Sequence, residues 1–170
     1  RQMANFLCLE KDEMAQNVLS TIINHCETCY AVLQSREAYA IHRKWLDEYR
    51  EYYDPIVWQR IDRGRRWEEK EIRHSEIQQE TIRCHFNKVF ADFDYLVMPA
   101  VPCPAVCKNT LSQQFRVGLL SLNSLGSMAG FPVLTIPIYL PSGLSGGLQI
   151  IYPTPQSQVP LNILDQIISM

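Results

Sequence analysis

Apolar side chains recur at helical spacing in four parts of the chain, residues 12–26, 35–53, 65–93 and 115–129. In each part, apolar residues three or four positions apart form a stripe along one face, which is typical of an amphipathic helix. Asp54-Pro55 ends the second helix, because the residue before a proline avoids the helical region. Pro55 also suits the first turn of a short further helix, which we expect to end at Gly64.

Shorter apolar runs predict strands at residues 29–33, 94–98, 133–140 and 148–152. Pro141-Ser142-Gly143 opens the connection between the last two, and proline and glycine supply the backbone angles that a reversal needs. We therefore expect an antiparallel hairpin that is buried on at least one face. A proline-rich loop, residues 100–105, follows the second strand. Residues 1–9 are predicted as a strand or a leading loop, and Pro160 opens a last helix.

Helices and strands alternate along the chain, which indicates an α/β fold. The 170 residues are enough for one domain with a core of its own. No internal repeat or low-complexity tract interrupts the pattern, so residues 1–170 are predicted to form a single domain without an internal boundary. The chain begins at Arg1 rather than at methionine, and we expect a piece of a longer polypeptide.

Composition argues against several classes of partner. The net charge of -2 gives no electrostatic basis for binding nucleic acid or an anionic membrane. Proline and glycine interrupt the uncharged stretch 117–158, so no membrane-spanning helix is predicted there. Cysteines such as Cys26, Cys29 and Cys84 lie in or near helical patterns rather than in a small loop-rich framework. This setting favours reduced thiols and a cytoplasmic protein.

Three motifs in the second half of the chain follow one another in a distinctive order. Asp94-Tyr-Leu-Val-Met-Pro99 follows the helix predicted at residues 65–93, Met128-Ala-Gly-Phe-Pro132 precedes the hairpin, and Gly147-Leu-Gln149 opens its second strand. This order resembles the C-terminal half of the amidase signature enzymes, where D-x-L-L-x-P, A-G-x-P and G-L-P-x-G-L-Q follow one another. Glu37-Ala38 also resembles the family. Ser145-Gly146 departs from it, because the family usually has proline and an apolar residue there.

The resemblance implies an amidase-signature-like mixed sheet flanked by helices, of which this chain forms only the C-terminal portion. It also implies an enzyme that hydrolyses amide C–N bonds through an acyl-serine intermediate, with a nucleophilic serine, a second serine and a lysine base. No segment of this sequence matches the Gly/Ser-rich nucleophile segment. We therefore expect no catalytic residue in this chain, which alone should be inactive. Leu120 stands near a position where the transamidating subunits carry an acidic residue, which argues against that branch.

The implied partners are a small amide substrate and an N-terminal catalytic part of the same polypeptide. A homo-oligomer is compatible with the sequence, and no metal or organic cofactor is implied. The alternative function is that of a non-catalytic α/β binding or scaffold domain derived from the same fold. It fits a chain that lacks the chemistry of the family.

This half of the family's enzymes contributes to the substrate funnel, so the resemblance suggests pocket residues. The candidates for substrate binding are Tyr39, Trp45, Trp58, Pro99 and Val101. The aromatic candidates have a competing role as core residues, because aromatic side chains bury a large area. Pro99 and its loop have a competing role in rigidifying the end of the strand.

Three other groups of residues could serve either in catalysis or metal binding, or simply in packing. They are the Cys26-x-x-Cys29 pair with Cys103 and Cys107, the adjacent Cys84 and His85, and the serines Ser121, Ser124 and Ser127 with His42, His74 or His85 as bases. A Cys-x-x-Cys pair suits zinc or redox chemistry, but cysteine is also among the most buried residue types. Adjacent helical residues point about 100° apart, so Cys84 and His85 should not face each other. We expect packing roles for all three groups.

Overall fold

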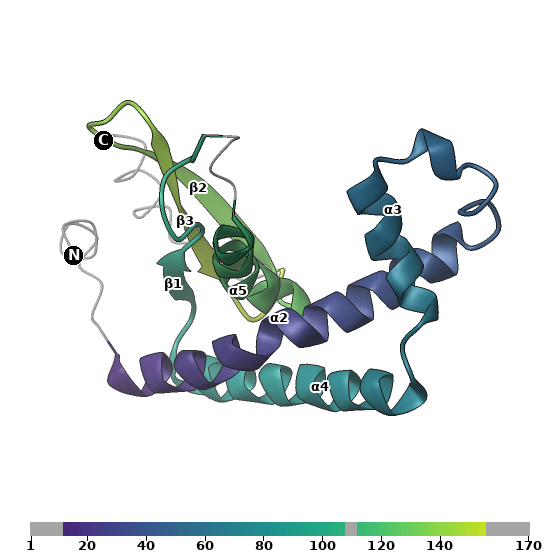
Figure 1. Cartoon of the computed structure of the whole chain (residues 1–170). Helices are drawn as coiled ribbons and strands as arrows, with labels where there is room; N and C mark the ends of the chain where they lie inside the picture. Colours follow the sequence, from purple (N-terminus) through teal and green to yellow (C-terminus); the bar gives the residue numbers. More distant parts are fainter. Residues whose placement is uncertain (1–11, 108–111, 156–170) are drawn as a thin grey trace.

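The computed structural model describes residues 12–107 and 112–155 of the protein (Figure 1). Its elements, in chain order, are α2 (Glu13–His42), η1 (Arg50–Tyr52), α3 (Pro55–Asp62), η2 (Arg63–Arg65), α4 (Glu69–Asp92), β1 (Leu96–Pro99), α5 (Gln113–Ala129), β2 (Val133–Tyr139) and β3 (Ser145–Ile151), where η marks a 3-10 helix. This succession of helices and strands confirms the predicted α/β class. The predicted leading strand or loop and the helix after Pro160 lie outside the described residues.

α2 is one continuous helix of 30 residues, so the strand predicted at residues 29–33 is wrong. The apolar stripe keeps its helical period there, and both Ile22 and Cys29 are buried on it. Ser35, where the second helix was predicted to begin, lies inside α2. Its hydroxyl donates to the carbonyl oxygen of Ala31 at 2.6 Å, which is how a serine satisfies itself within a helix.

The helix that was predicted to reach Tyr53 ends at His42. The chain turns there, and Leu46 becomes fully buried against Trp58 and Ile61. The indole Nε1 of Trp58 donates to the carbonyl oxygen of Leu46 at 3.0 Å. The turn is favoured because it buries these apolar side chains. Continuing α2 as a helix would leave them exposed to water.

α3 begins after Asp54, as the sequence predicts. One carboxylate oxygen of Asp54 accepts hydrogen bonds from the N–H groups of Ile56 at 2.9 Å and Val57 at 3.2 Å. These bonds satisfy amides of the first turn that have no partner within the helix. η2 continues directly from α3 and contains Gly64, and both elements pack against α2.

α4 lies along α2 over much of its length (Figure 1). It begins at Glu69, after a capping box formed by Glu68 and Glu71, rather than at Arg65 as predicted. The apolar face predicted for its second half is confirmed, because Ile82 and Phe86 are buried in the main core.

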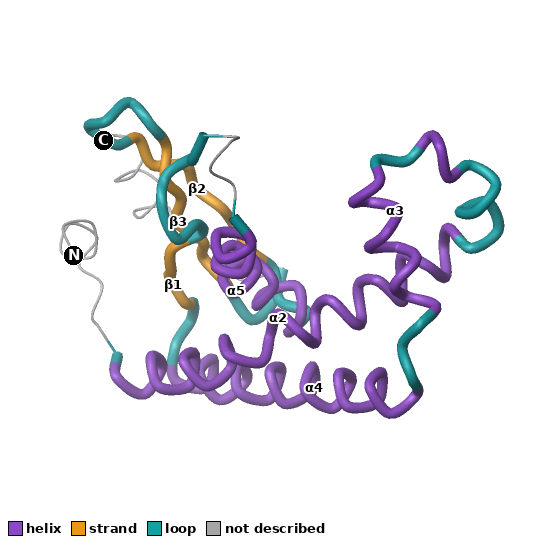
Figure 2. The backbone as a smooth tube through the Cα atoms, in the orientation of Figure 1, coloured by secondary structure: helices purple, strands orange, loops and turns teal. Residues whose placement is uncertain are grey.

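The three described strands form one sheet in the order β1-β3-β2, and both neighbouring pairs are antiparallel. This arrangement confirms the predicted hairpin, although β3 begins at Ser145 rather than at Leu148. In the register, Gln149 of β3 lies between Met98 of β1 and Thr135 of β2. The strands and α5 gather toward one end of α2, whereas α3 lies near its other end (Figure 2).

Both faces of the sheet carry apolar clusters. Met98 and Ile151 belong to the main core together with residues of α2, α4 and α5. Ile136 and Ile150 form the centre of a second cluster. Residues at odd and even positions of a strand point to opposite faces, so β3 contributes Ile151 to the main core and Ile150 to the second cluster.

Gly64 is predicted to tolerate no larger residue. A Cβ at this position would lie 2.0 Å from the carbonyl oxygen of Ser35 in α2, which is far inside van der Waals contact. Gly64→Ala should therefore lower the free energy of unfolding by at least about 2 kcal/mol, measured by urea denaturation. The matched control is Gly146→Ala, whose Cβ would meet its nearest atom at 3.9 Å, and it should change stability by no more than about 0.5 kcal/mol. Equal losses in the two variants would contradict this packing.

Candidate functional site

Two separate regions carry the residues that the sequence suggests for substrate binding. The first is the arm, residues 43–68, which connects α2 to α4 and contains Trp45 and Trp58. The second is the exit loop, residues 100–107, which follows β1. α3, the central helix of the arm, lies apart from the sheet that precedes and supports the exit loop (Figures 1 and 2).

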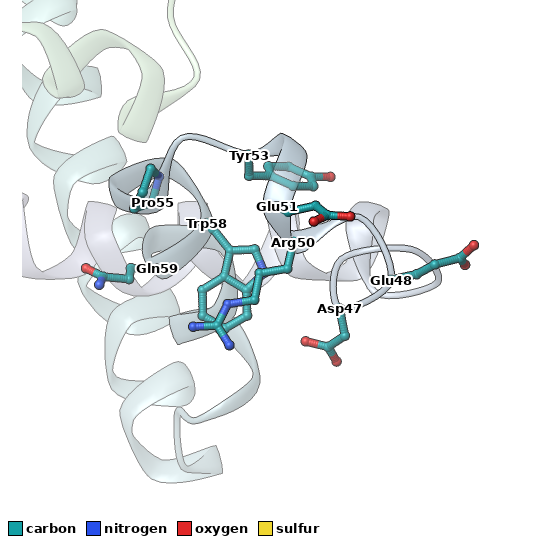
Figure 3. Close-up of a pocket in the computed structure, with 8 residues that line it drawn as sticks. All are labelled: Asp47, Glu48, Arg50, Glu51, Tyr53, Pro55, Trp58 and Gln59. Atoms are coloured by element: carbon teal, nitrogen blue, oxygen red, sulfur yellow. The ribbon is translucent and has the colours of Figure 1, made fainter.

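The arm contains an open pocket of about 480 Å³ (Figure 3). Its lining residues are Asp47, Glu48, Arg50, Glu51, Tyr53, Pro55, Trp58 and Gln59. The guanidinium of Arg50 lies over the ring of Trp58, 4.3 Å from the ring centroid. Trp58 is only 8% exposed. The lining of the pocket combines two aromatic side chains, one cation and several carboxylates.

Tyr53 connects the pocket to α2 by hydrogen bonds. Its hydroxyl oxygen accepts from the indole Nε1 of Trp45 at 3.0 Å and lies 2.7 Å from Nδ1 of His42. The rings of His42 and Tyr53 also meet edge to face. These contacts hold Trp45 in place, although its side chain is 38% exposed. His42 is thus engaged with an aromatic residue of the arm, not with a serine of α5.

Ion pairs fix the base of the arm. Two nitrogens of Arg65 donate to the carboxylate of Asp47 at 2.8 and 3.0 Å. This hydrogen-bonded contact holds the pKa of Asp47 below its usual value. Arg65 and Arg66 also pair with Asp62, whose side chain is fully buried. Asp47 is therefore a structural carboxylate and not a poised general base.

Tyr39 belongs to the same region and has a packing role there. It lies on α2, is half-buried, and packs against the small core of Leu46, Trp58 and Ile61. The arm therefore brings Tyr39, Trp45 and Trp58 into one neighbourhood. Tyr39 and Trp58 take part in its core, and Trp58 also lines its pocket.

The exit loop is fastened to β3 and α5. The N–H of Ala100 donates to the carbonyl oxygen of Gly147 at 2.8 Å. The side-chain Nε2 of Gln149 donates to the carbonyl oxygens of Pro99 at 3.0 Å and Leu122 at 3.1 Å. In the sequence, Gln149 stands out only as part of a family motif. The signal for its structural role is its position as a polar residue within an otherwise apolar strand.

Pro99 and Val101 lie beside these contacts. Pro99 is exposed at the end of β1, and Val101 is half-buried at the start of the loop. The structure therefore divides the five candidates into three residues in or next to the arm and two at the sheet. Their role in substrate binding stays a prediction.

Ser121 and Ser124 of α5 are hydrogen-bonded within the helix, whereas Ser127 is exposed. The hydroxyl of Ser124 donates to the carbonyl oxygen of Leu120 at 2.5 Å and lies 3.1 Å from the Sγ of Cys26. The hydroxyl of Ser121 donates to the carbonyl oxygen of Val117 at 2.8 Å. A hydroxyl bonded to its own helix lacks the activating base that a nucleophile needs. These contacts support the packing role expected for Ser121 and Ser124.

The cysteine and histidine alternatives also have structural explanations. Cys26 and Cys29 are buried on α2, whereas Cys103 is exposed in the exit loop. Among the side chains that the structure describes, no three of His, Cys, Asp or Glu are grouped closely enough to hold a metal ion. His85 uses Nδ1 for the carbonyl oxygen of Thr81 at 2.7 Å, one turn earlier in α4.

Comparisons with known proteins identify the fold. No protein-family model matches the chain. In sequence, it is 35% identical over 78 residues to one of the subunits of the glutamyl-tRNA(Gln) amidotransferase from Streptococcus equi subsp. zooepidemicus (strain MGCS10565), a match that covers 44% of this chain and 16% of that protein. The expectation drawn from Leu120, which argued against the transamidating branch, stays a prediction.

Solved structures extend the likeness to most of the chain. An amidase crystal structure superposes with a TM-score of 0.70 and 26% identity, covering 79% of this chain and 33% of the amidase. A bacterial aryl acylamidase of the amidase signature family superposes with a TM-score of 0.63 and 17% identity, covering 92% of this chain and 39% of that enzyme. The chain thus has the fold of part of an amidase signature enzyme and spans well under half the length of these proteins. In the described part, no helix is long and apolar enough to cross a membrane.

The buried thiols are predicted to be unreactive in the folded protein. Burial raises the pKa of both Cys26 and Cys29, so the reactive thiolate is disfavoured as well as shielded. Iodoacetamide should modify Cys84 and Cys103, which are exposed, at least about 100-fold faster than the buried pair, as read by peptide mass mapping. In urea all four should react at similar rates. Fast labelling of Cys26 without denaturant would contradict its place in the core.

The same pKa shifts predict a stability change at alkaline pH. A raised thiol pKa in the folded state stabilises the protein below the unfolded value of about 8.5, and this contribution is lost as the pH rises above it. The free energy of unfolding should therefore fall between about pH 8.5 and 10. A Cys26→Ala/Cys29→Ala double variant should be less stable throughout but should show a smaller fall than the unmodified protein. An identical fall in the two proteins would assign the effect to other groups.

Proposed function

We propose that this chain is the C-terminal, pocket-forming portion of an amidase-like hydrolase. The observation that carries the proposal is the fold shared with an amidase at 26% identity over 79% of the chain. The hydrolysis of a small amide would use a nucleophilic serine and a lysine base from an N-terminal part of the same polypeptide.

The proposed reaction passes through an acyl-serine ester. The serine oxygen attacks the amide carbon, the C–N bond breaks, and the amine leaves with a proton. Water then hydrolyses the ester to release the acid and regenerate the serine. Backbone N–H groups would stabilise the oxyanion in both steps. Ser121 and Ser124 of α5 donate to carbonyl oxygens of their own helix, which supports a supply of the nucleophile from elsewhere.

The role of this chain would be to shape the substrate funnel and exclude water. Pro99 and Val101 would form one apolar wall, where a fastened loop offers fixed contacts. Tyr39, Trp45 and Trp58 would support a separate contact surface on the arm, apart from this wall (Figure 1). The apolar wall at Pro99 and Val101 suits the nonpolar part of a small amide, whether aryl, aliphatic or peptide-like. The pocket of the arm differs from it, because charged side chains make up much of its lining. We further propose a cytoplasmic protein with reduced thiols.

The second candidate is a non-catalytic binding or scaffold domain. The observation in its favour is that the serines, histidines and buried cysteines described above have structural partners and form no nucleophile–base pair in the described part of the chain. The arm would then serve as a docking element, because Tyr52 and Ile56 are largely exposed. Self-association into a homo-oligomer belongs to the same set of proposals.

Amide hydrolysis distinguishes the two candidates. The product of the complete gene should hydrolyse aryl amides, fatty amides or short peptide amides, and a serine-directed phosphonate should abolish the turnover. The 170-residue chain alone should show no turnover under the same conditions, because we expect no activated serine in it. If the complete gene product lacks both an upstream Gly/Ser-rich segment and activity, the scaffold function is correct. Phosphonate-sensitive turnover by the isolated chain would contradict the proposed division of labour.

A further inference from the structure

We propose that Gln149 is a positioning residue, which sets the exit loop against α5 and thereby fixes the contacts that Pro99 and Val101 offer to substrate. Its two donated hydrogen bonds reach two elements that are far apart in sequence, the end of β1 and the middle of α5. The part of the inference that concerns substrate rests on the proposed function. The part that concerns the loop stands on geometry alone.

Both protons of the Gln149 side-chain amide are donated in these two hydrogen bonds. The side chain is 1% exposed in the centre of β3. An amide nitrogen carries two protons, and here its two acceptors are the carbonyl oxygens of Pro99 and Leu122 at 3.0 and 3.1 Å. A flipped amide would place its own oxygen against both carbonyls, so only one orientation is compatible with the site. Because both amide protons of this buried side chain are hydrogen-bonded, the side chain fixes the distance between the carbonyl groups of Pro99 and Leu122.

Two further contacts make the loop a rigid unit with β3 and α5. The N–H of Ala100 donates to Gly147, and Ala100 itself is buried. Pro102 lies over α5, where a Cβ added to Gly118 would stand 3.4 Å from the proline ring. Val101 therefore sits between two anchored neighbours and follows any movement of either.

Hydrogen bonding explains why glutamine is suited to this position. Methionine has nearly the same length and shape but donates no hydrogen bond, so it would leave two carbonyl oxygens without this partner. Glutamate is closer in character. Burial beside two carbonyl oxygens favours its protonated form, which has one proton to donate instead of two. The series Gln, Glu, Met thus removes the donors one at a time at nearly constant volume.

Hydrogen–deuterium exchange of the 170-residue chain tests the positioning directly. In Gln149→Met, the amide of Ala100, which donates to the carbonyl oxygen of Gly147 at 2.8 Å at the start of the exit loop, should exchange at least about tenfold faster, as expected from the loss of a buried hydrogen bond. The β2–β3 hairpin should keep its protection. The exchange rate of the loop in Gln149→Glu should lie between those of the unmodified chain and Gln149→Met. Gln114→Met, at an exposed position of α5, should exchange at the rate of the unmodified chain. Unchanged loop exchange in Gln149→Met, or equal acceleration over the whole molecule, would overturn the inference.

Activity provides a second readout in the complete gene product. Gln149→Met should raise KM for an amide substrate about tenfold while kcat changes by less than about threefold, because a displaced wall weakens binding without touching the reacting atoms. Gln149→Glu should recover part of the loss. If no amide is hydrolysed by any protein in the series, the proposed function fails, yet loop exchange still decides the role of Gln149. If Gln149→Met does not fold, Gln149→Glu decides, and exchange equal to that of the unmodified chain would refute the positioning role.

Discussion

The rest of the fold depends on the burial of β3, the strand that pairs with both of its neighbours. Its side chains alternate between the helices on one face and a second apolar cluster on the other, so Ile151 and Ile150 are both almost fully buried. A shift of one residue would exchange the two faces and bring Gln149 out of reach of its acceptors. The register of β1 and β2, and with it the position of the exit loop, follows from this one strand.

Local sequence patterns predicted the elements whose boundaries have a local cause. The start of α3 after Asp54 and the hairpin turn at Gly143 are examples, because a capping carboxylate and a glycine with a positive φ act within a few residues. The middle of α2 was missed for the opposite reason. Residues 29–33 have the composition of a strand, but contacts with α4 and α5 keep them helical. The end of α2 at His42 depends on Trp58, which lies in the next α-helix of the sequence.

The candidate site was predictable only in part, because a sequence names residue types and not their neighbours. The family resemblance suggested the aromatic residues 39, 45 and 58 as candidates for one site, and the structure places them in one region. The proline loop could be recognised as rigid. Nothing in the spacing showed that arm and loop lie apart, or that Gln149 joins residues 27 and 50 positions away. Long-range hydrogen bonds of this kind leave no periodic signal.

Polar groups inside this chain are used to hold elements together. Ser35 receives the indole N–H of Trp67, Asp62 pairs with two arginines, and Arg83 donates to the carbonyl oxygen of Ala129 at the end of α5. Each of these side chains is hydrogen-bonded or ion-paired to a structural partner rather than to a neighbouring nucleophile or base, which is the pairing that catalysis needs. The polar side chains named here thus serve to fix the positions of the helices and the loops between them. Gln149 is suited to the same role, because its amide forms hydrogen bonds but neither ionises nor reacts.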